Sequence, residues 1–300
     1  MSASGTPINR TNIELPNDVS SEILQKTQEG SVIMQLARQI PLPGRGVQIP
    51  VIASDPTASW VTETGAKPVS TPTLNKKIMQ AHKLAVIVPF SDEFRRDLAS
   101  LYDALVSRLP GVLAKTFDAT CFFGPSAGSL ANFDNLSAVT LVKLDNDVSS
   151  PVYTGLVAAD AAIANQGGIM SGIALAPQGK SVMLNALDGD GRPLFNAVTE
   201  NGISRVLGAP TYVASAAYKA GTSGTSGNPD VLGFAGDWSH AMYGIVQGVN
   251  IGYSDQATLV DASSNTINLF QQNMFAVRAE IEIGFVAETD YFVRLGRTHV

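Results

Sequence analysis

The segment between residues 54 and 75 constrains the fold of this chain more than any other stretch. Two apolar, strand-like runs flank it, GVQIPVIA (46–53) and KKIMQAHKLAVIVPFS (76–91), and this pattern predicts a long, protruding hairpin. Its tip, ASWVTETGAKPVSTPTLN, places Trp60, one of only two tryptophans, and Lys67 among Thr, Ser, Gly and Pro residues. Such a segment has too little apolar material for a core of its own. A large aromatic side chain there needs cover from outside the hairpin.

The composition points to a partner chain as that cover. The 300 residues are enough for one large domain or two ordinary ones with a sizeable core. Charged residues make up 15% of the chain, against roughly 25% in typical soluble domains. We therefore expect part of the nominal surface to be buried against another chain. The net charge of −6 gives no overall basic signature for nucleic acid.

Cysteine content and the N-terminal sequence indicate in which compartment the protein is made. Cys121 is the single cysteine, so no internal disulfide can form. The opening residues, MSASGTPINRTN, lack the basic and apolar regions of a signal peptide. Apolar runs also stay below the ~18 residues needed to span a bilayer. We expect a protein made in the cytosol, with no membrane partner.

Hydrophobic periodicity predicts a mixed α+β chain. Residues 101–123 form a long helix in this interpretation, ended by Gly124 and Pro125. Its predicted buried stripe consists of Leu101, Leu105, Leu109, Val112, Leu113 and Phe117. Further helices are expected over 154–166 and 179–187, and further strands over 171–177, 207–215, 241–254 and 291–295.

The segment 273–288, NMFAVRAEIEIGFVAE, has the clearest pattern in the chain. One face carries apolar residues at every second position: Phe275, Val277, Ala279, Ile281, Ile283 and Phe285. Arg278, Glu280 and Glu282 lie on the other face. This alternation predicts a long strand with one buried side.

Motifs for conventional catalysis are weak. GPSAG (124–128) matches the G-x-S-x-G pattern around Ser126, but that motif needs a strand before the serine, and here a helix is predicted. His82, His240 and His299 are far apart and have no metal-ligand spacing, so we expect neither a metal nor a cofactor.

Taken together, the order of these segments resembles the major capsid protein of tailed bacteriophages, with the Hong Kong 97-type fold. The resemblance covers nearly the whole chain. It is carried by these motifs: SWVTETGAKPVS, VPFSDEF, LNALDGDGRPLF, LGAPTYVAS, GFAGDWSHAMYGIV and FAVRAEIEIGFVAETDYFVRL. Each motif is moderately specific, and their order and spacing make the similarity strong.

The resemblance implies a division of the chain. It assigns these parts: residues 1–45 an N-terminal arm, 46–90 an E-loop hairpin, 91–150 the spine helix and peripheral domain, 151–254 an axial domain, and 255–300 the return strands of the peripheral domain. In such shells the hairpin lies across a neighbouring subunit, so Trp60 and Lys67 are expected at an interface.

The same resemblance implies the partners. It predicts a homo-oligomer of pentamers and hexamers that forms an icosahedral shell around double-stranded DNA, in a virion assembled in the bacterial cytoplasm. Portal, protease and decoration proteins are further partners of such shells, and scaffolding is expected from a separate protein or none. Contact with DNA is expected to be non-specific, through local cations such as Arg10 and Lys26.

Some family members join an E-loop lysine to an asparagine of a neighbouring subunit through an isopeptide bond, with a glutamate as base. Lys67, Asn273 and Glu280 match these positions. Asn273 and Glu280 are seven residues apart, so a regular strand would point them to opposite faces, and the bond would need residues of different subunits.

Two alternatives stay open from the sequence. One is the shell protein of a cellular nanocompartment, similar to encapsulins, which holds a cargo enzyme instead of DNA. The other is a monomeric serine hydrolase that uses Ser126.

Overall fold

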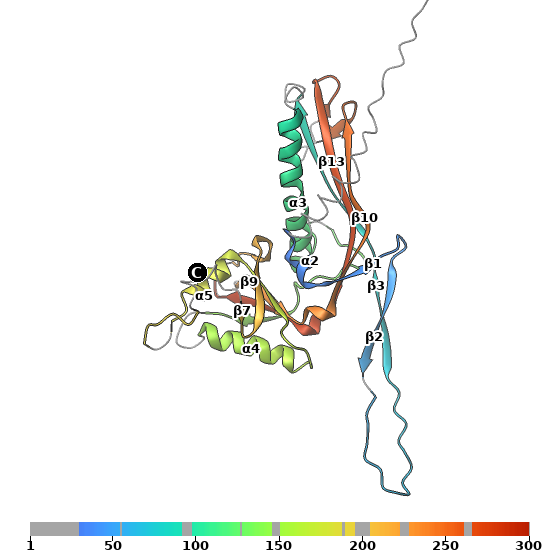
Figure 1. The fold of residues 1–300 in the computed structure, drawn as a ribbon, viewed down its shortest axis with the longest axis vertical. Coiled ribbons are helices and arrows are strands. Elements are labelled where there is room, and N and C mark those ends of the chain that lie inside the picture. Colours follow the sequence, from blue (N-terminus) through green and yellow to red (C-terminus); the bar gives the residue numbers. More distant parts are fainter. Residues whose placement is uncertain are drawn as a thin grey trace, which may run out of the picture.

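A computed structural model describes residues 30–54, 56–91, 98–126, 128–145, 151–187, 190–195, 205–222, 228–260 and 266–299. Residues 1–29 of the predicted arm, with Arg10 and Lys26, lie outside these ranges. Figure 1 shows an elongated arrangement in which a long helix follows long strands, a second sheet with its helices lies beside them, and a hairpin projects away. Within the described ranges, no helix combines the length and apolar character needed to cross a membrane.

The first sheet has four strands in the order β1-β10-β13-β4. Their bounds are Arg38–Pro41 (β1), Ala241–Ser254 (β10), Met274–Ala287 (β13) and His82–Ser91 (β4). β13 is antiparallel to both of its neighbours. Its predicted apolar face, from Phe275 to Phe285, is buried, whereas Arg278 is exposed. The alternation therefore correctly identified the side of β13 that faces the core.

Helix α3 (Leu98–Phe123) lies along this sheet (Figure 1). Leu109 and Leu113 pack against the sheet core that contains Phe275 and Ile281. Phe117 is buried in the next core along the helix. The prediction was wrong for Val112, which is 48% exposed, because the buried stripe repeats every four residues and leaves Val112 beside it. Gly124 ends the helix at φ +83°, as expected of a residue in the left-handed region.

The second sheet has six strands in the order β5-β14-β9-β6-β8-β7. Their bounds are Thr140–Lys143 (β5), Phe292–Arg297 (β14), Asp230–Gly236 (β9), Gly172–Leu175 (β6), Ala209–Val213 (β8) and Arg205–Val206 (β7). Helices α4 (Val152–Ala164) and α5 (Pro177–Leu184) pack on this sheet through a shared apolar core. A short hairpin, β11 (Thr258–Val260) with β12 (Thr266–Asn268), follows β10.

Each sheet draws strands from more than one of the segments expected from the sequence. β10, from the segment 151–254, pairs with β13 and not with β9. Conversely, β14 from the segment 255–300 pairs with β9 and with β5. The reason is that the chain crosses between the sheets three times, from β4 through α3 to β5, from β9 to β10 and from β13 to β14.

The last two crossings each run through a single 3-10 turn, η3 (Trp238–His240) from β9 to β10 and η4 (Thr289–Tyr291) from β13 to β14. The turns are tied together, because Asp237 N–H donates to the Tyr291 carbonyl (3.0 Å) and Glu288 N–H to that of His240 (3.1 Å). The His240 ring also stacks on Tyr291 with centroids 3.8 Å apart. The core beneath joins residues of both sheets, including Phe285 of β13 and Phe234 of β9. The two sheets are thereby packed into one body.

A buried carboxylate holds the first described segment against α3. Asp118 accepts hydrogen bonds from the Ser31 hydroxyl (2.5 Å), Val32 N–H (2.9 Å) and Ile33 N–H (3.3 Å). These groups form the N-terminus of the short helix α2 (Val32–Leu36). Burial raises the pKa of Asp118 to about 6, although the three hydrogen bonds oppose this shift.

This carboxylate predicts a pH dependence of subunit stability. Between pH ~4 and ~6 the folded chain keeps a proton on Asp118 that the unfolded chain has lost, so the free energy of unfolding falls as pH rises through this window. A shift from 3.8 to about 6 corresponds to about 3 kcal/mol at 1.36 kcal/mol per pKa unit. Asp118→Asn is expected to remove this slope in denaturant unfolding measured from pH 4 to 7, whereas the exposed Asp160→Asn control keeps it. An unchanged slope in Asp118→Asn would contradict the assignment.

Candidate intersubunit interface

The predicted hairpin exists and forms a two-stranded sheet of its own, β2 (Val47–Ser54) paired with β3 (Thr73–Met79). The sequence predicted one strand over 76–91, but the chain breaks at Gln80–Ala81 and continues as β4. The break coincides with a contact to the loop before β5, where Gln80 N–H donates to the Asn132 carbonyl (3.3 Å). The hairpin therefore leaves the four-stranded sheet and projects from the body (Figure 1).

The base of the hairpin is firmly anchored. Met79 is fully buried with Leu42 and Val286, and Lys77 Nζ donates to Asp134 Oδ2 at 2.8 Å. Gly46 turns the chain into β2 at φ +83°, and a Cβ atom there would lie 2.6 Å from the Met79 carbonyl oxygen. Only glycine fits such a position without moving the backbone. The hairpin thus starts from a fixed point on the body.

The loop beyond the strands is open to solvent. Trp60 is 104% exposed and Val69 is 93% exposed. The loop is held by local bonds such as Thr57 N–H to Ser70 Oγ (2.9 Å) and Gly65 N–H to the Thr62 carbonyl (2.9 Å). Lys67 lies between Trp60 and Val69 and is exposed as well. Two large apolar side chains at the end of an anchored arm make a surface that a second chain could cover.

The other two cross-link candidates lie on or beside β13. Asn273 is exposed and directly precedes the strand, with φ 49°. Its neighbour Met274 pairs with Ser91, at the end of β4 that lies far from the hairpin. Glu280 pairs with Ala85, its side chain is 20% exposed, and its Oε2 lies 3.5 Å from Arg278 Nε.

These positions separate the three candidates within one chain. The parity argument from the sequence does not apply, because Asn273 lies outside the strand. Met274, the residue after Asn273, is nevertheless six residues from Glu280 along β13, or about 20 Å at 3.4 Å per residue. The hairpin loop, which contains Lys67, extends away from β13 (Figure 1). One chain therefore does not bring Lys67, Asn273 and Glu280 together.

The structure does not support the hydrolase motif. Ser126 follows the C-terminus of α3 and not a strand, so it does not sit on a nucleophile elbow. The three histidines are separated, with His82 Nε2 near the Ala131 carbonyl, His240 Nδ1 near Glu288 and His299 Nδ1 near Asp230. In the ranges that the structure covers, no three His, Cys, Asp or Glu residues cluster as metal ligands would.

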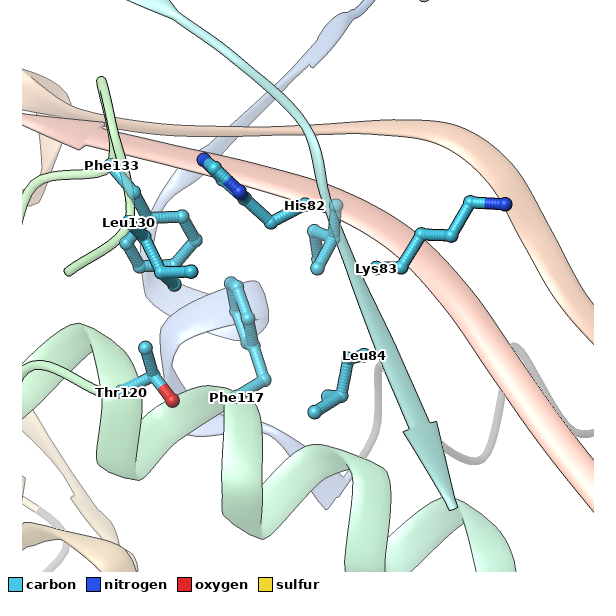
Figure 2. A pocket seen from close by; sticks show the side chains of 8 residues that line it. His82, Lys83, Leu84, Phe117, Thr120, Leu130 and Phe133 are labelled. Carbon is cyan, nitrogen blue, oxygen red and sulfur yellow. The ribbon is translucent and has the colours of Figure 1, made fainter. Parts of the chain in front are cut away.

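A cavity opens at the start of β4, between this strand, α3 and the loop before β5 (Figure 2). Its apolar walls are Leu84, Phe117, Leu130, Phe133 and Ile283, and His82 and Thr120 add polar groups. Its empty volume, including the part open to solvent, is about 330 Å³. Sequence reasoning missed this site, because Leu130 and Phe133 belong to a polar loop and no pattern in the sequence relates them to β4.

The chain is similar to known proteins both in sequence and in fold. The profile of the phage capsid family matches residues 12–293. The probable major capsid protein of Mycobacterium phage L5 is 28% identical over 299 residues, covering 94% of this chain and 88% of the relative. A solved chain from Mycobacterium phage Ogopogo superposes with a TM-score of 0.73 at 20% identity, covering 89% of this chain and 92% of its own length. A chain from Gordonia phage Cozz gives 0.71 at 22% identity, covering 90% and 87%.

Both likenesses extend over nearly the whole chain. The solved phage chains share the fold over about nine tenths of this chain, and the family profile reaches from the N-terminal segment into β14. The chain belongs to the phage capsid family.

Proposed function

We propose that the chain is the major capsid protein of a tailed bacteriophage, which assembles with copies of itself into an icosahedral shell around double-stranded DNA. The observation that carries this proposal is the anchored hairpin with Trp60 and Val69 exposed at its loop, in a chain of the phage capsid family. Relatives bearing the name major capsid protein support it. The role is structural: the protein acts by covering surfaces between copies.

Electron microscopy and sedimentation of the purified chain test the proposal. Closed particles are expected, made of pentamers and hexamers in which residues 151–254 supply contacts around the symmetry axes. Particles isolated from the source should contain double-stranded DNA. Particles filled with a cargo enzyme would instead favour the nanocompartment, and a monomer that never assembles would rule out both shells.

DNA contact is expected to be weak and insensitive to sequence. The chain has a net charge of −6, so attraction depends on local cations, for example Arg108 and Lys115 on the exposed side of α3. Binding of assembled subunits to duplex DNA should therefore fall steeply with added salt. A titration at several salt concentrations with two unrelated duplexes measures this. Tight, salt-resistant binding that prefers one duplex would contradict it.

We also infer that covalent cross-linking by Lys67, Asn273 and Glu280 takes place between subunits. The match of these three residues to the family positions supports it, as does their separation within one chain. The autocatalytic bond is the one chemical reaction that we assign to this otherwise structural protein.

A further inference from the structure

We propose that the cavity beside His82 receives the Trp60 side chain of a neighbouring copy. This inference rests on the proposed shell function and names the surface that covers the hairpin loop. Its starting point is a pair of features on one chain: a fully exposed indole on a projecting arm, and an apolar cavity open at the surface.

The hairpin of the same chain does not fill this cavity. His82, which lines the cavity, is the first residue of β4, and β3 ends three residues before it at Met79. The seven residues of β3 carry the chain away from this point by about 24 Å at 3.4 Å per residue. The loop with Trp60 lies beyond β3 and points away from α3 (Figure 1). The occupant must come from a second copy.

The walls of the cavity suit an indole ring. His82 and Phe133 meet edge to face with centroids 6.1 Å apart, and Phe133 meets Phe117 in the same way at 6.5 Å. Figure 2 shows these rings around one space, with Leu84 on β4 and Thr120 on α3. Aromatic rings favour such edge-to-face neighbours, and a buried tryptophan also needs an acceptor for its N–H. Thr120 Oγ1 donates its proton to the Thr116 carbonyl (2.8 Å), which leaves its lone pairs for that N–H.

Charge favours the same pairing. Glu63 follows Trp60 by three residues on the loop and is exposed. Lys83 adjoins the cavity and points away from the aromatic rings toward solvent (Figure 2). When the indole enters the cavity, the carboxylate of Glu63 approaches a surface that carries this ammonium group. Glu63 of the loop and Lys83 at the rim of the cavity are therefore complementary in sign.

The arrangement also suits a shell. A knob and a receiving cavity at different places on one chain make a heterologous contact, which leaves a free knob and a free cavity after each addition. Such contacts continue from copy to copy until they close on themselves. One pair of features per chain is enough to link every subunit to two others.

Photo-cross-linking tests the assignment directly. We would replace Trp60 by p-benzoyl-phenylalanine, assemble the variant with ¹⁵N-labelled copies, irradiate the particles and map the linked peptides by mass spectrometry. Cross-links to residues 82–84, 117–120 or 130–133 of a different copy are expected. The same probe at the exposed Ile169 is the control and should not reach these peptides. Links from position 60 that fall elsewhere, or none in intact particles, would overturn the inference.

A cavity-filling variant gives a second test. Thr120→Trp places an indole from within the same chain into the cavity and is expected to raise the concentration needed for assembly at least tenfold. Trp60→Ala combined with it should add little, because both changes remove one contact. Thr116→Trp, one turn earlier on the exposed side of α3, is the matched control and should assemble as the original chain does. Full additivity of the two changes would contradict a shared contact.

The outcomes separate this inference from the proposed function. A chain that forms no particles under any condition would refute the shell itself. Particles in which position 60 links to another surface would leave the shell intact and refute only the cavity.

Discussion

Trp60→Ala is expected to prevent shell formation at concentrations at which the original chain assembles, without weakening the fold of the subunit. The side chain is fully exposed in the single chain, and surface truncations of this kind change the free energy of unfolding by only about 0.5 kcal/mol or less. An indole that becomes buried in an interface removes about 150–250 Å² from water. At about 25 cal/mol per Å² this is at most about 4 to 6 kcal/mol per contact.

The binding free energy lost in Trp60→Ala should be smaller than this upper limit but still large. Replacing a tryptophan at the centre of an interface by alanine weakens the binding free energy by about 2 to 4 kcal/mol. Each 1.4 kcal/mol is a tenfold change in affinity, so each contact should weaken by about 30-fold to 1,000-fold. Many such contacts act together in a closed shell, which makes the effect on assembly steeper than that on one pair.

Light scattering over a range of subunit concentrations measures the assembly threshold, and thermal unfolding of free subunits measures the fold. Trp60→Phe is the control and should keep most of the assembly. Hydrogen exchange adds an independent reading: the amides of residues 56–72 should exchange rapidly in the free subunit and become protected in particles. Assembly of Trp60→Ala at the original threshold, or protection of this loop before assembly, would show that the hairpin is not the contact we infer.

The elements that sequence analysis predicted best are long strands with one buried side. The predicted segment 241–254 has the same bounds as β10, and 273–288 differs from β13 by one residue at each end. In such strands apolar residues on the buried face alternate with polar residues on the exposed face, so a single sequence is enough to locate them. The hairpin was predicted for a related reason, since its polar loop stands between two apolar runs.

Elements that depend on distant partners were not predictable in the same way. β9 is buried at all seven positions and contains two glycines, so it has neither alternation nor strong strand propensity. β1 has four residues and pairs in parallel with β10, about 200 residues later in the chain. The break between β3 and β4 coincides with a contact to Asn132. Each of these features is fixed by tertiary contacts that leave no local pattern.

The candidate site also contains one part that the sequence could predict and one part that it could not. Trp60 could be singled out because a large aromatic side chain is unusual in a polar loop, whereas Lys67 was assigned only through its match to the family position. The cavity could not, because its walls come from α3, β4 and the loop containing Phe133. The position of Asn273 also differs from the sequence-based expectation. Asn273 has a left-handed backbone conformation that ends the turn before β13, so it lies outside the strand.

Mature particles boiled in detergent are expected to run as a ladder of linked subunits, or as material too large to enter the gel. In the reaction that we infer, the neutral amine of Lys67 attacks the side-chain amide carbon of Asn273. A new C–N bond forms, the bond to the original amide nitrogen breaks, and ammonia leaves. The carboxylate of Glu280 accepts the proton that the amine gives up and passes it to the leaving amide nitrogen, which restores the carboxylate. An ammonium group must first lose a proton, which burial between subunits favours, and an interface also supplies proximity.

The geometry of the single chain explains why this bond would wait for assembly. Lys67 is exposed on the hairpin loop, and Asn273 is exposed at the end of β13 that pairs with Ser91. Glu280 lies further along β13, beside Arg278. Because these three positions are far apart in one subunit, free subunits should remain unlinked for as long as they stay unassembled, and linking should follow the formation of particles.

Substitution of any one of the three residues should collapse the ladder to a single subunit band. Lys67→Arg removes the nucleophile, Asn273→Asp the amide that is attacked, and Glu280→Gln the base. Two matched controls should keep the ladder: Lys76→Arg, an exposed lysine on the same hairpin, and Glu282→Gln, on the same face of β13 as Glu280. Mass spectrometry of the linked peptide should show the loss of one ammonia, about 17 Da, relative to the sum of its parts. If particles of the original chain already run as one subunit band, Lys67, Asn273 and Glu280 contribute only packing, and non-covalent contacts such as that of Trp60 must hold the shell alone.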